Sequence, residues 1–254
     1  MAKIHDKTTM GGMKSVFQTT IWTEIRSAKT NDRARKRTII DSLLRKYWKP
    51  VYCYLRSKGY SNESAKDLTQ GFFHEIVLGR NLIQQADQNK GRFRTFLLTT
   101  LNRYITDIHR RDTAKKRKPM EATVQLEPAN LPNLPAKQSE AEPEQVFHYA
   151  WASNLLDEVL TKVKDEYYST GKSTHWEVFN AKVLTPIVEN AKPSSLAKIC
   201  AKYGLEKPSQ ASNMIITVKR RFRVVLERQM RQIVRSDLEL EEEFRELLEI
   251  LSKK

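Results

Sequence analysis

The chain has 254 residues, 45 Lys and Arg against 30 Asp and Glu, and a formal net charge of +15. This length allows two small domains, and the 8 glycines in the whole chain argue against a β-rich fold and for helices. The positive charge favours polyanionic partners, because neutralising phosphates releases condensed counterions. No stretch approaches the roughly 20 apolar residues of a bilayer-spanning helix, and the N-terminus lacks the apolar run of a signal peptide. We therefore expect a cytoplasmic protein with no membrane insertion.

The apolar spacing of the first third predicts helices. Residues 1–16 are polar with a Gly-Gly pair, and we expect them to be disordered. Apolar positions in 34–47 fit one amphipathic helix. Pro50 is expected to begin a new helix, since proline suits the first helical position, and Gly59 to end it.

A capping pattern at Ser61 predicts the start of a further helix, which Gly79 would end. Phe72 and Phe73 are adjacent, and two adjacent side chains of a helix do not face one core. We therefore expect one of them at the surface beside polar neighbours, which would make a protein-docking patch. A helix wedged between two others is the alternative interpretation. Beyond it, the apolar stripe of 92–111 predicts a long helix.

The second half predicts a linker followed by a helix-turn-helix. Five prolines lie between 119 and 143, and the apolar period disappears there, which is typical of an extended linker. Helical spacing returns at 146–163. Ser194 and Ser195 would cap a short helix that ends at Gly204 and precedes a long, Arg-rich helix opened by Pro208. This order is typical of a helix-turn-helix.

The last segment, 238–251, is amphipathic and acidic. Its glutamates, Glu243 among them, are expected to lie opposite an apolar face that includes Leu248. The simplest interpretation is a helix that packs on the preceding module. A sharper hypothesis is that this segment competes with DNA for the basic helix after Pro208.

Enzyme and metal motifs are incomplete. Gly171-Lys172-Ser173-Thr174 lacks the earlier glycine of a phosphate-binding loop, and His74-Glu75 lacks the second histidine of a zinc-protease motif. Cys53 and Cys200 lie in apolar helical runs and are expected to be buried thiols. We expect no catalytic residues, no cofactor and no metal, and hence a protein that is not an enzyme.

The chain resembles bacterial RNA polymerase sigma factors of the ECF (extracytoplasmic function) type. The resemblance rests on four motifs, which read FxTTxW, YWxPVYxYLR, DLTQxFF and GRFRxFLL in this family. Here they are Phe17–Trp22, Tyr47–Arg56, Asp67–Phe73 and Gly91–Leu98. The resemblance implies an all-α fold with two helical domains, sigma region 2 and sigma region 4, joined by a Pro-rich linker.

The resemblance also implies the domain boundaries. They are 1–16 disordered N-terminus, 17–112 region 2, 113–145 flexible linker, 146–236 region 4 with its helix-turn-helix, and 237–254 acidic C-terminal helix.

Three sets of site residues follow from the resemblance. The set implied to bind core polymerase is Asp67, Leu68, Thr69, Gln70, Phe72 and Phe73. The set implied to recognise and open the −10 element is Asn89, Lys90, Arg92, Arg94, Asn102, Arg103, Thr106, Asp107, Arg110 and Arg111. The set implied to read the −35 element is Gln210, Ser212, Asn213, Thr217, Lys219, Arg220, Arg221 and Arg223.

The expected function is that of a sigma factor, which directs transcription initiation by binding core polymerase and by recognising and melting promoter DNA. Its partners would be the β′ and β subunits of core RNA polymerase, promoter DNA and, as a further candidate, an anti-sigma factor. One alternative is a helix-turn-helix transcription regulator that does not bind polymerase. A helical DNA recombinase or nuclease is a second alternative, which no metal cluster in the sequence supports.

Overall fold

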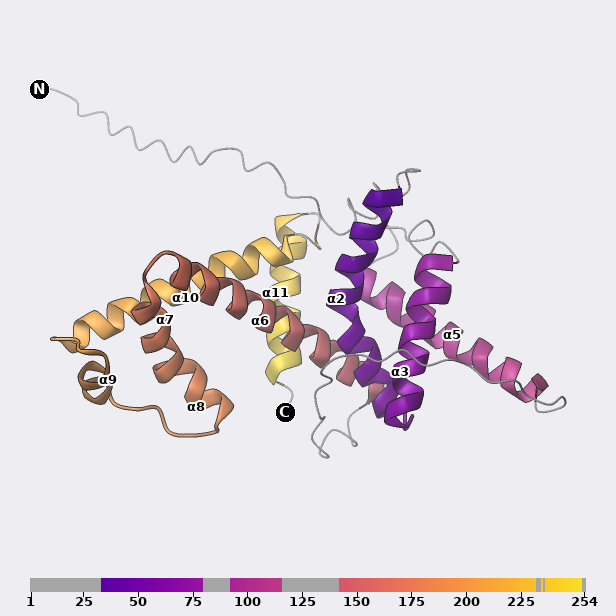
Figure 1. Cartoon of the computed structure of the whole chain (residues 1–254), viewed down its shortest axis with the longest axis horizontal. Coiled ribbons are helices and arrows are strands. Elements are labelled where there is room, and N and C mark those ends of the chain that lie inside the picture. Colours follow the sequence, from indigo (N-terminus) through magenta and orange to yellow (C-terminus); the bar gives the residue numbers. More distant parts are fainter. Residues whose placement is uncertain (1–32, 80–91, 116–141, 232–233, 235, 253–254) are drawn as a thin grey trace, which may run out of the picture.

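The computed structural model describes residues 33–79, 92–115, 142–231, 234 and 236–252, and over these residues the fold is all-α, as predicted (Figure 1). The predicted disordered segment 1–16, the first family motif and nearly all of the predicted linker lie outside the described residues. The elements in chain order are α2 (Arg33–Ser57), α3 (Asn62–Gly71), the π-helical turn η1 (Phe72–Gly79), α5 (Phe93–Lys115), α6 (Pro143–Ser169), α7 (Ser173–Phe179), the π-helical turn η4 (Asn180–Leu184), α8 (Thr185–Val188), α9 (Leu196–Tyr203), α10 (Pro208–Met230) and α11 (Asp237–Ser252).

The helix boundary predicted at Pro50 is wrong, because α2 continues through this proline to Ser57. A proline inside a helix removes one backbone donor and costs about 3 kcal/mol. Burial on the same helix offsets this cost: Val51, Tyr54 and Leu55 are fully buried, and burying each such side chain contributes roughly 1.5–3 kcal/mol. Tertiary packing therefore overrides the local signal.

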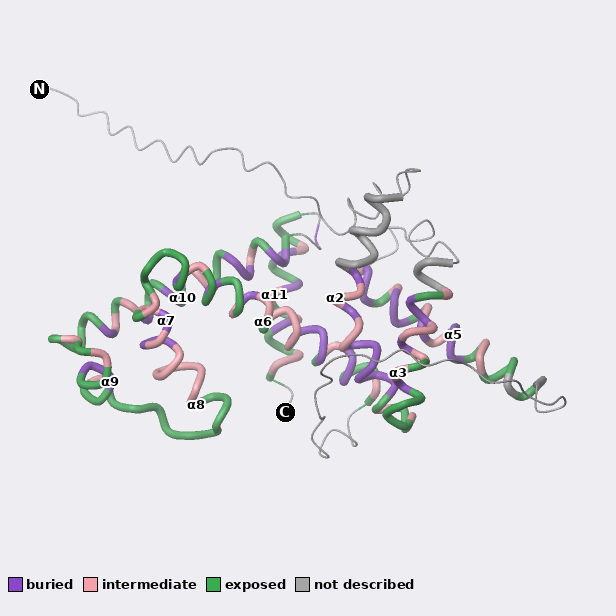
Figure 2. Tube along the Cα trace, viewed as in Figure 1, coloured by how far each residue is buried: buried purple, intermediate pink, exposed green. Residues whose placement is uncertain are grey.

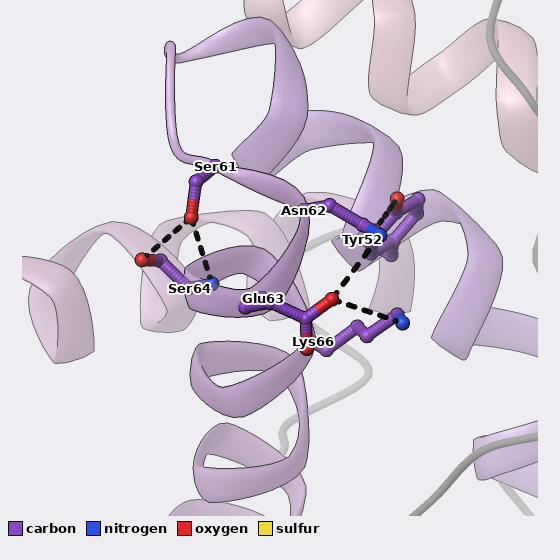
Figure 3. Close-up of polar contacts among 6 residues, drawn as sticks. All are labelled: Tyr52, Ser61, Asn62, Glu63, Ser64 and Lys66. Atoms are coloured by element: carbon purple, nitrogen blue, oxygen red, sulfur yellow. Dashed lines mark hydrogen bonds and ion pairs between the residues drawn. The ribbon is translucent and has the colours of Figure 1, made fainter.

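The cap predicted at Ser61 is confirmed (Figure 3). Its hydroxyl oxygen accepts a hydrogen bond from the Ser64 backbone N–H at 3.1 Å, which satisfies one of the otherwise unpaired donors of the first turn. The Tyr52 hydroxyl donates to Asn62 Oδ1 at 2.7 Å and ties the start of α3 to α2. Gly59 has a φ of +88° just beyond the end of α2, as expected for a glycine stop.

The surface position predicted for one phenylalanine of the Phe72-Phe73 pair is wrong, because both side chains are buried. The Phe72 ring makes an edge contact with Tyr104 of α5, with centroids 5.6 Å apart. The Phe73 ring stacks on Trp48 of α2 at 5.9 Å. The helix is thus wedged between two others, and the π-helical turn that begins at Phe72 changes the angular step between neighbouring side chains.

Helix α6 connects the two halves of the molecule (Figures 1 and 2). Its first turns pack on α2, where Phe147 makes an edge contact with Tyr54 at 6.3 Å. Its last turns pack on α7 and α10. One continuous set of buried apolar residues extends from Leu43 to Leu247. Because α6 packs on α2 near one end and on α10 near the other, its length sets the distance between α2 and α10.

The predicted helix-turn-helix elements form as expected. Ser195 caps α9, its hydroxyl oxygen accepting from the Lys198 backbone N–H at 3.3 Å. Gly204 ends α9 with a φ of +66°, and the Leu205 N–H donates to the Cys200 carbonyl. Pro208 occupies the start of α10. These local devices set the turn between α9 and α10.

Helix α11 is amphipathic, but its buried face differs from the predicted one. Leu240, Glu243 and Leu247 are buried, whereas Leu248, which was predicted to lie on the apolar face, is 66 % exposed. The positions 240, 243 and 247 recur at helical spacing and face α6 and α10. Glu243 therefore lies on the buried face of α11, where only apolar side chains were expected.

Candidate nucleic-acid interface

The outer face of α10 carries exposed polar and basic side chains at helical spacing. Asn213, Thr217 and Arg220 follow one another at intervals of four and three positions, and all three are exposed. Lys219 and Arg223 are exposed beside them. The opposite face, which includes Ala211, Ile215 and Val218, is buried in the core. The helix thus presents a cationic, hydrogen-bonding surface that faces solvent.

Two further residues of the −35 set have structural roles. The Gln210 side-chain oxygen accepts from the Glu206 and Lys207 backbone N–H groups at 3.0 and 3.2 Å, so it caps α10. The Arg221 guanidinium donates to Glu166 of α6 at 2.8 Å. Ser212 is half-buried. The exposed members of the set are Gln210, whose side chain caps α10, and Asn213, Thr217, Lys219, Arg220 and Arg223.

Sequence reasoning missed the lysines of α9. Lys198 and Lys202 are exposed and lie four positions apart, one turn from each other on α9. In helix-turn-helix proteins the first helix crosses the DNA backbone while the second enters the major groove. Two lysines four positions apart on the helix that precedes α10 were the signal that could have identified them.

A second basic surface lies on α5, at the other end of the molecule from α9 (Figure 1). Arg103, Thr106 and Arg110 are exposed and recur at helical spacing. Arg111 is exposed and pairs with Glu75 at 3.1 Å. Asn102 is half-buried and accepts from the Tyr54 hydroxyl at 2.5 Å.

The rest of the −10 set is placed less simply. Asp107 is half-buried, and Asn89 and Lys90 lie outside the described residues. The structure thus brings Arg103, Thr106 and Arg110 together on one exposed stripe of α5 and separates them from the first two arginines of the set.

Those two arginines, Arg92 and Arg94, pair with glutamates of α11. Arg92 Nε lies 3.0 Å from Glu243 Oε2, and Arg94 Nη2 lies 2.6 Å from Glu246 Oε2. Arg92 also pairs with Glu246, and Arg94 with Glu243. The Arg94 side chain is 3 % exposed, and its guanidinium lies 4.4 Å from the ring centroid of Trp151. In this arrangement Arg94 does not face solvent.

Burial changes the ionisation of groups around this cluster. It lowers the pKa of Arg94 to about 10, with a contribution from neighbouring Arg92, so Arg94 stays charged at neutral pH. Burial, together with Arg94 and Arg92, lowers the pKa of His148 to about 4. The Nδ1 atom of His148 is buried and has no hydrogen-bond partner among the described residues. His148 is therefore neutral at neutral pH.

The set predicted to bind polymerase is divided between surface and core. Asp67 is exposed on α3, and Leu68 and Gln70 are half-buried. Thr69 is buried and its hydroxyl donates to the Ala65 carbonyl at 2.7 Å. Thr69 and the two buried phenylalanines of this set do not reach solvent, so they support the surface of α3 by packing under it. The side chains of this set that reach solvent are those of Asp67, Leu68 and Gln70.

The part of the chain that is described contains no candidate metal site, and both of its cysteines are buried. No group of three His, Cys, Asp or Glu side chains there could hold a metal ion. Cys53 and Cys200 are buried free thiols, as predicted, and burial raises the pKa of Cys53 to about 11. A thiol with such a pKa is a poor nucleophile at neutral pH.

None of the described helices combines the length and the apolar character needed to cross a bilayer. Comparison with known proteins gives no relative: no family model matches the chain, and neither a curated protein nor a solved structure matches it.

Proposed function

We propose that the protein is a sigma factor that directs core RNA polymerase to promoter DNA. The observation that carries the proposal is the exposed face of α10, where Asn213, Thr217 and Arg220 follow a capped α9 and a Gly204 turn. Amide, hydroxyl and guanidinium groups are the side chains that read base edges in the major groove. The four sequence motifs shared with sigma factors support the proposal that the protein binds core polymerase.

The mechanism is binding without bond chemistry. Helix α10 enters the major groove, and Lys198 and Lys202 of α9 contact the phosphates, which positions the helix. The stripe of Arg103, Thr106 and Arg110 on α5 binds the second promoter element. There an unstacked base is captured, and its contacts offset a few kcal/mol of unpairing.

Promoter binding is tested by reversing one charge on α10. Arg220→Glu removes a groove contact and adds repulsion, so DNA affinity should fall at least about tenfold. Arg245→Glu is the matched control, because Arg245 is also exposed on a helix but lies outside the α9–α10 face. Equal affinities for both variants and the unaltered chain would contradict the assignment of α10.

Polymerase binding is tested on α3. Asp67→Arg should weaken co-purification with core polymerase and leave DNA binding by α10 unchanged. Asp165→Arg, which reverses an exposed charge on α6, is the matched control. A chain that binds DNA through α10 but never binds core polymerase would instead be a DNA-binding regulator.

A further inference from the structure

Helix α11 places two carboxylates against the first basic residues of α5. Glu243 is 2 % exposed, and Glu246 lies beside it with a side chain that is 29 % exposed. Together they pair with both Arg92 and Arg94. Arg94 and Glu243 are 149 positions apart in the sequence. Two arginines thus meet two carboxylates from a distant segment.

The chemistry of this contact resembles that of arginine with a nucleic-acid backbone. Guanidinium groups bind carboxylate and phosphate oxygens with the same two-pronged geometry. The Arg94 guanidinium also lies over the Trp151 ring. The ring covers one face of the guanidinium, and the N–H groups at its edges bind the anion. A phosphate and the carboxylates of α11 would therefore use the same donors and could not occupy them together.

The contacts of α11 tie it both to the end of α10 and to the start of α5. Helix α11 packs on α6 and α10 through Leu240 and Leu247, and its glutamates reach the start of α5. Arg231, just after α10, pairs with Asp237 at the start of α11 at 2.6 Å. The acidic helix is thus held to α10 at one end and to α5 by Glu243 and Glu246.

We infer that α11 is an autoinhibitory clamp, whose Glu243 and Glu246 occupy Arg92 and Arg94 in place of nucleic-acid phosphates until DNA displaces them. This inference rests on the proposed function for the identity of the competing anion. It differs from the competition expected from the sequence, because the arginines that are occupied lie at the start of α5, Arg92 directly before it and Arg94 in its first turn, and not on α10. DNA binding at Arg92 and Arg94 then requires opening of the clamp, which lowers the affinity of the closed chain.

The test removes the two clamp charges and compares the result with the removal of two others. Glu243→Gln/Glu246→Gln weakens the clamp, and Glu241→Gln/Glu242→Gln neutralises two exposed glutamates of the same helix with the same change in net charge. The affinity of each full-length chain is measured by fluorescence anisotropy for a labelled duplex that contains an unpaired stretch. Helical circular dichroism checks folding, and the single variant Glu246→Gln, at the less buried carboxylate, serves if the double variant is unfolded.

The clamp predicts that the Glu243/Glu246 variant binds the probe roughly five- to tenfold more tightly than the Glu241/Glu242 variant. Amide hydrogen exchange in the first turns of α5 should also rise in the first variant only. Equal affinities for the two variants would overturn the clamp and leave the proposed function intact. Tighter DNA binding without any binding of core polymerase would support the clamp and contradict the proposed function.

Discussion

Arg94 of α5 and Glu243 of α11 form an ion pair in which both side chains are almost fully buried, 3 % and 2 % exposed. Removing two charges from water costs several kcal/mol per ion, and only close, well-oriented pairing offsets that cost. Leu240 and Leu247 already bury α11 on its neighbours. The pair therefore contributes specificity of placement for α11 more than net stability.

Breaking this pair on one side should destabilise the protein strongly. Glu243→Ala leaves the buried Arg94 charge with only the partly exposed Glu246 as a partner, and we expect a loss of about 3 kcal/mol in the free energy of unfolding, the lower end of the range for a broken buried pair. Replacing both residues by apolar ones, Arg94→Met with Glu243→Leu, should recover most of that loss. Urea unfolding of Arg94→Met, of Glu243→Leu and of the double variant measures the coupling free energy between the two side chains. Additive losses would show that the two side chains do not interact.

Close packing at Gly71 should make this position intolerant of a side chain. A Cβ atom there would lie 2.5 Å from the Tyr104 hydroxyl oxygen, and the Tyr104 ring is held in the core by Phe72. Gly71→Ala is expected to cost about 1–3 kcal/mol of stability, as overpacking does.

Tyr104→Phe removes the clashing oxygen atom and should recover part of the Gly71→Ala loss. Thermal unfolding of the single and double variants measures that recovery. An unchanged melting temperature in Gly71→Ala alone would contradict the close approach of the two helices.

His148 should make stability depend on pH. Its pKa is about 4 in the folded chain and about 6.5 when unfolded, so the unfolded chain binds more protons between these values. The stabilising contribution of neutral His148 is complete above pH 6.5 and is lost as the pH falls towards 4. Because the side chain is partly exposed, we expect a contribution of about 1 kcal/mol.

The measurement compares His148→Gln with the unaltered chain, because carboxylates titrate in the same range in both. The difference in unfolding free energy between them should shrink by this amount from pH 7 to pH 4. A difference that stays constant over this range would show that His148 keeps its ordinary pKa.

Local signals predicted the helices and most of their ends. Ser61, Ser195, Gly59 and Gly204 act within one or two turns of the chain, so their effect is written in adjacent residues. Helices α9 and α10 and the turn between them could be predicted for the same reason. The polar set of α10 was implied by the family resemblance, and Asn213, Thr217 and Arg220 of that set lie at helical spacing on the exposed face.

The features that could not be predicted all depend on contacts between distant segments. Pro50 stays inside α2 because its neighbours pack on other helices. Phe73 is buried because Trp48 of another helix covers it. Glu243 is buried because Arg94 meets it there. In each case the position of a residue is decided by its contacts with a distant segment, which the residues next to it in the sequence do not encode.

Run-off transcription with purified core polymerase measures whether the protein directs promoter-specific initiation. A pool of templates with randomised promoter sequences is transcribed with the unaltered protein, with Arg220→Glu and with Arg245→Glu. The account predicts transcripts from a shared promoter sequence with the unaltered protein and Arg245→Glu, and their loss with Arg220→Glu. Core polymerase that yields the same transcripts with and without the protein would contradict the assignment as a sigma factor.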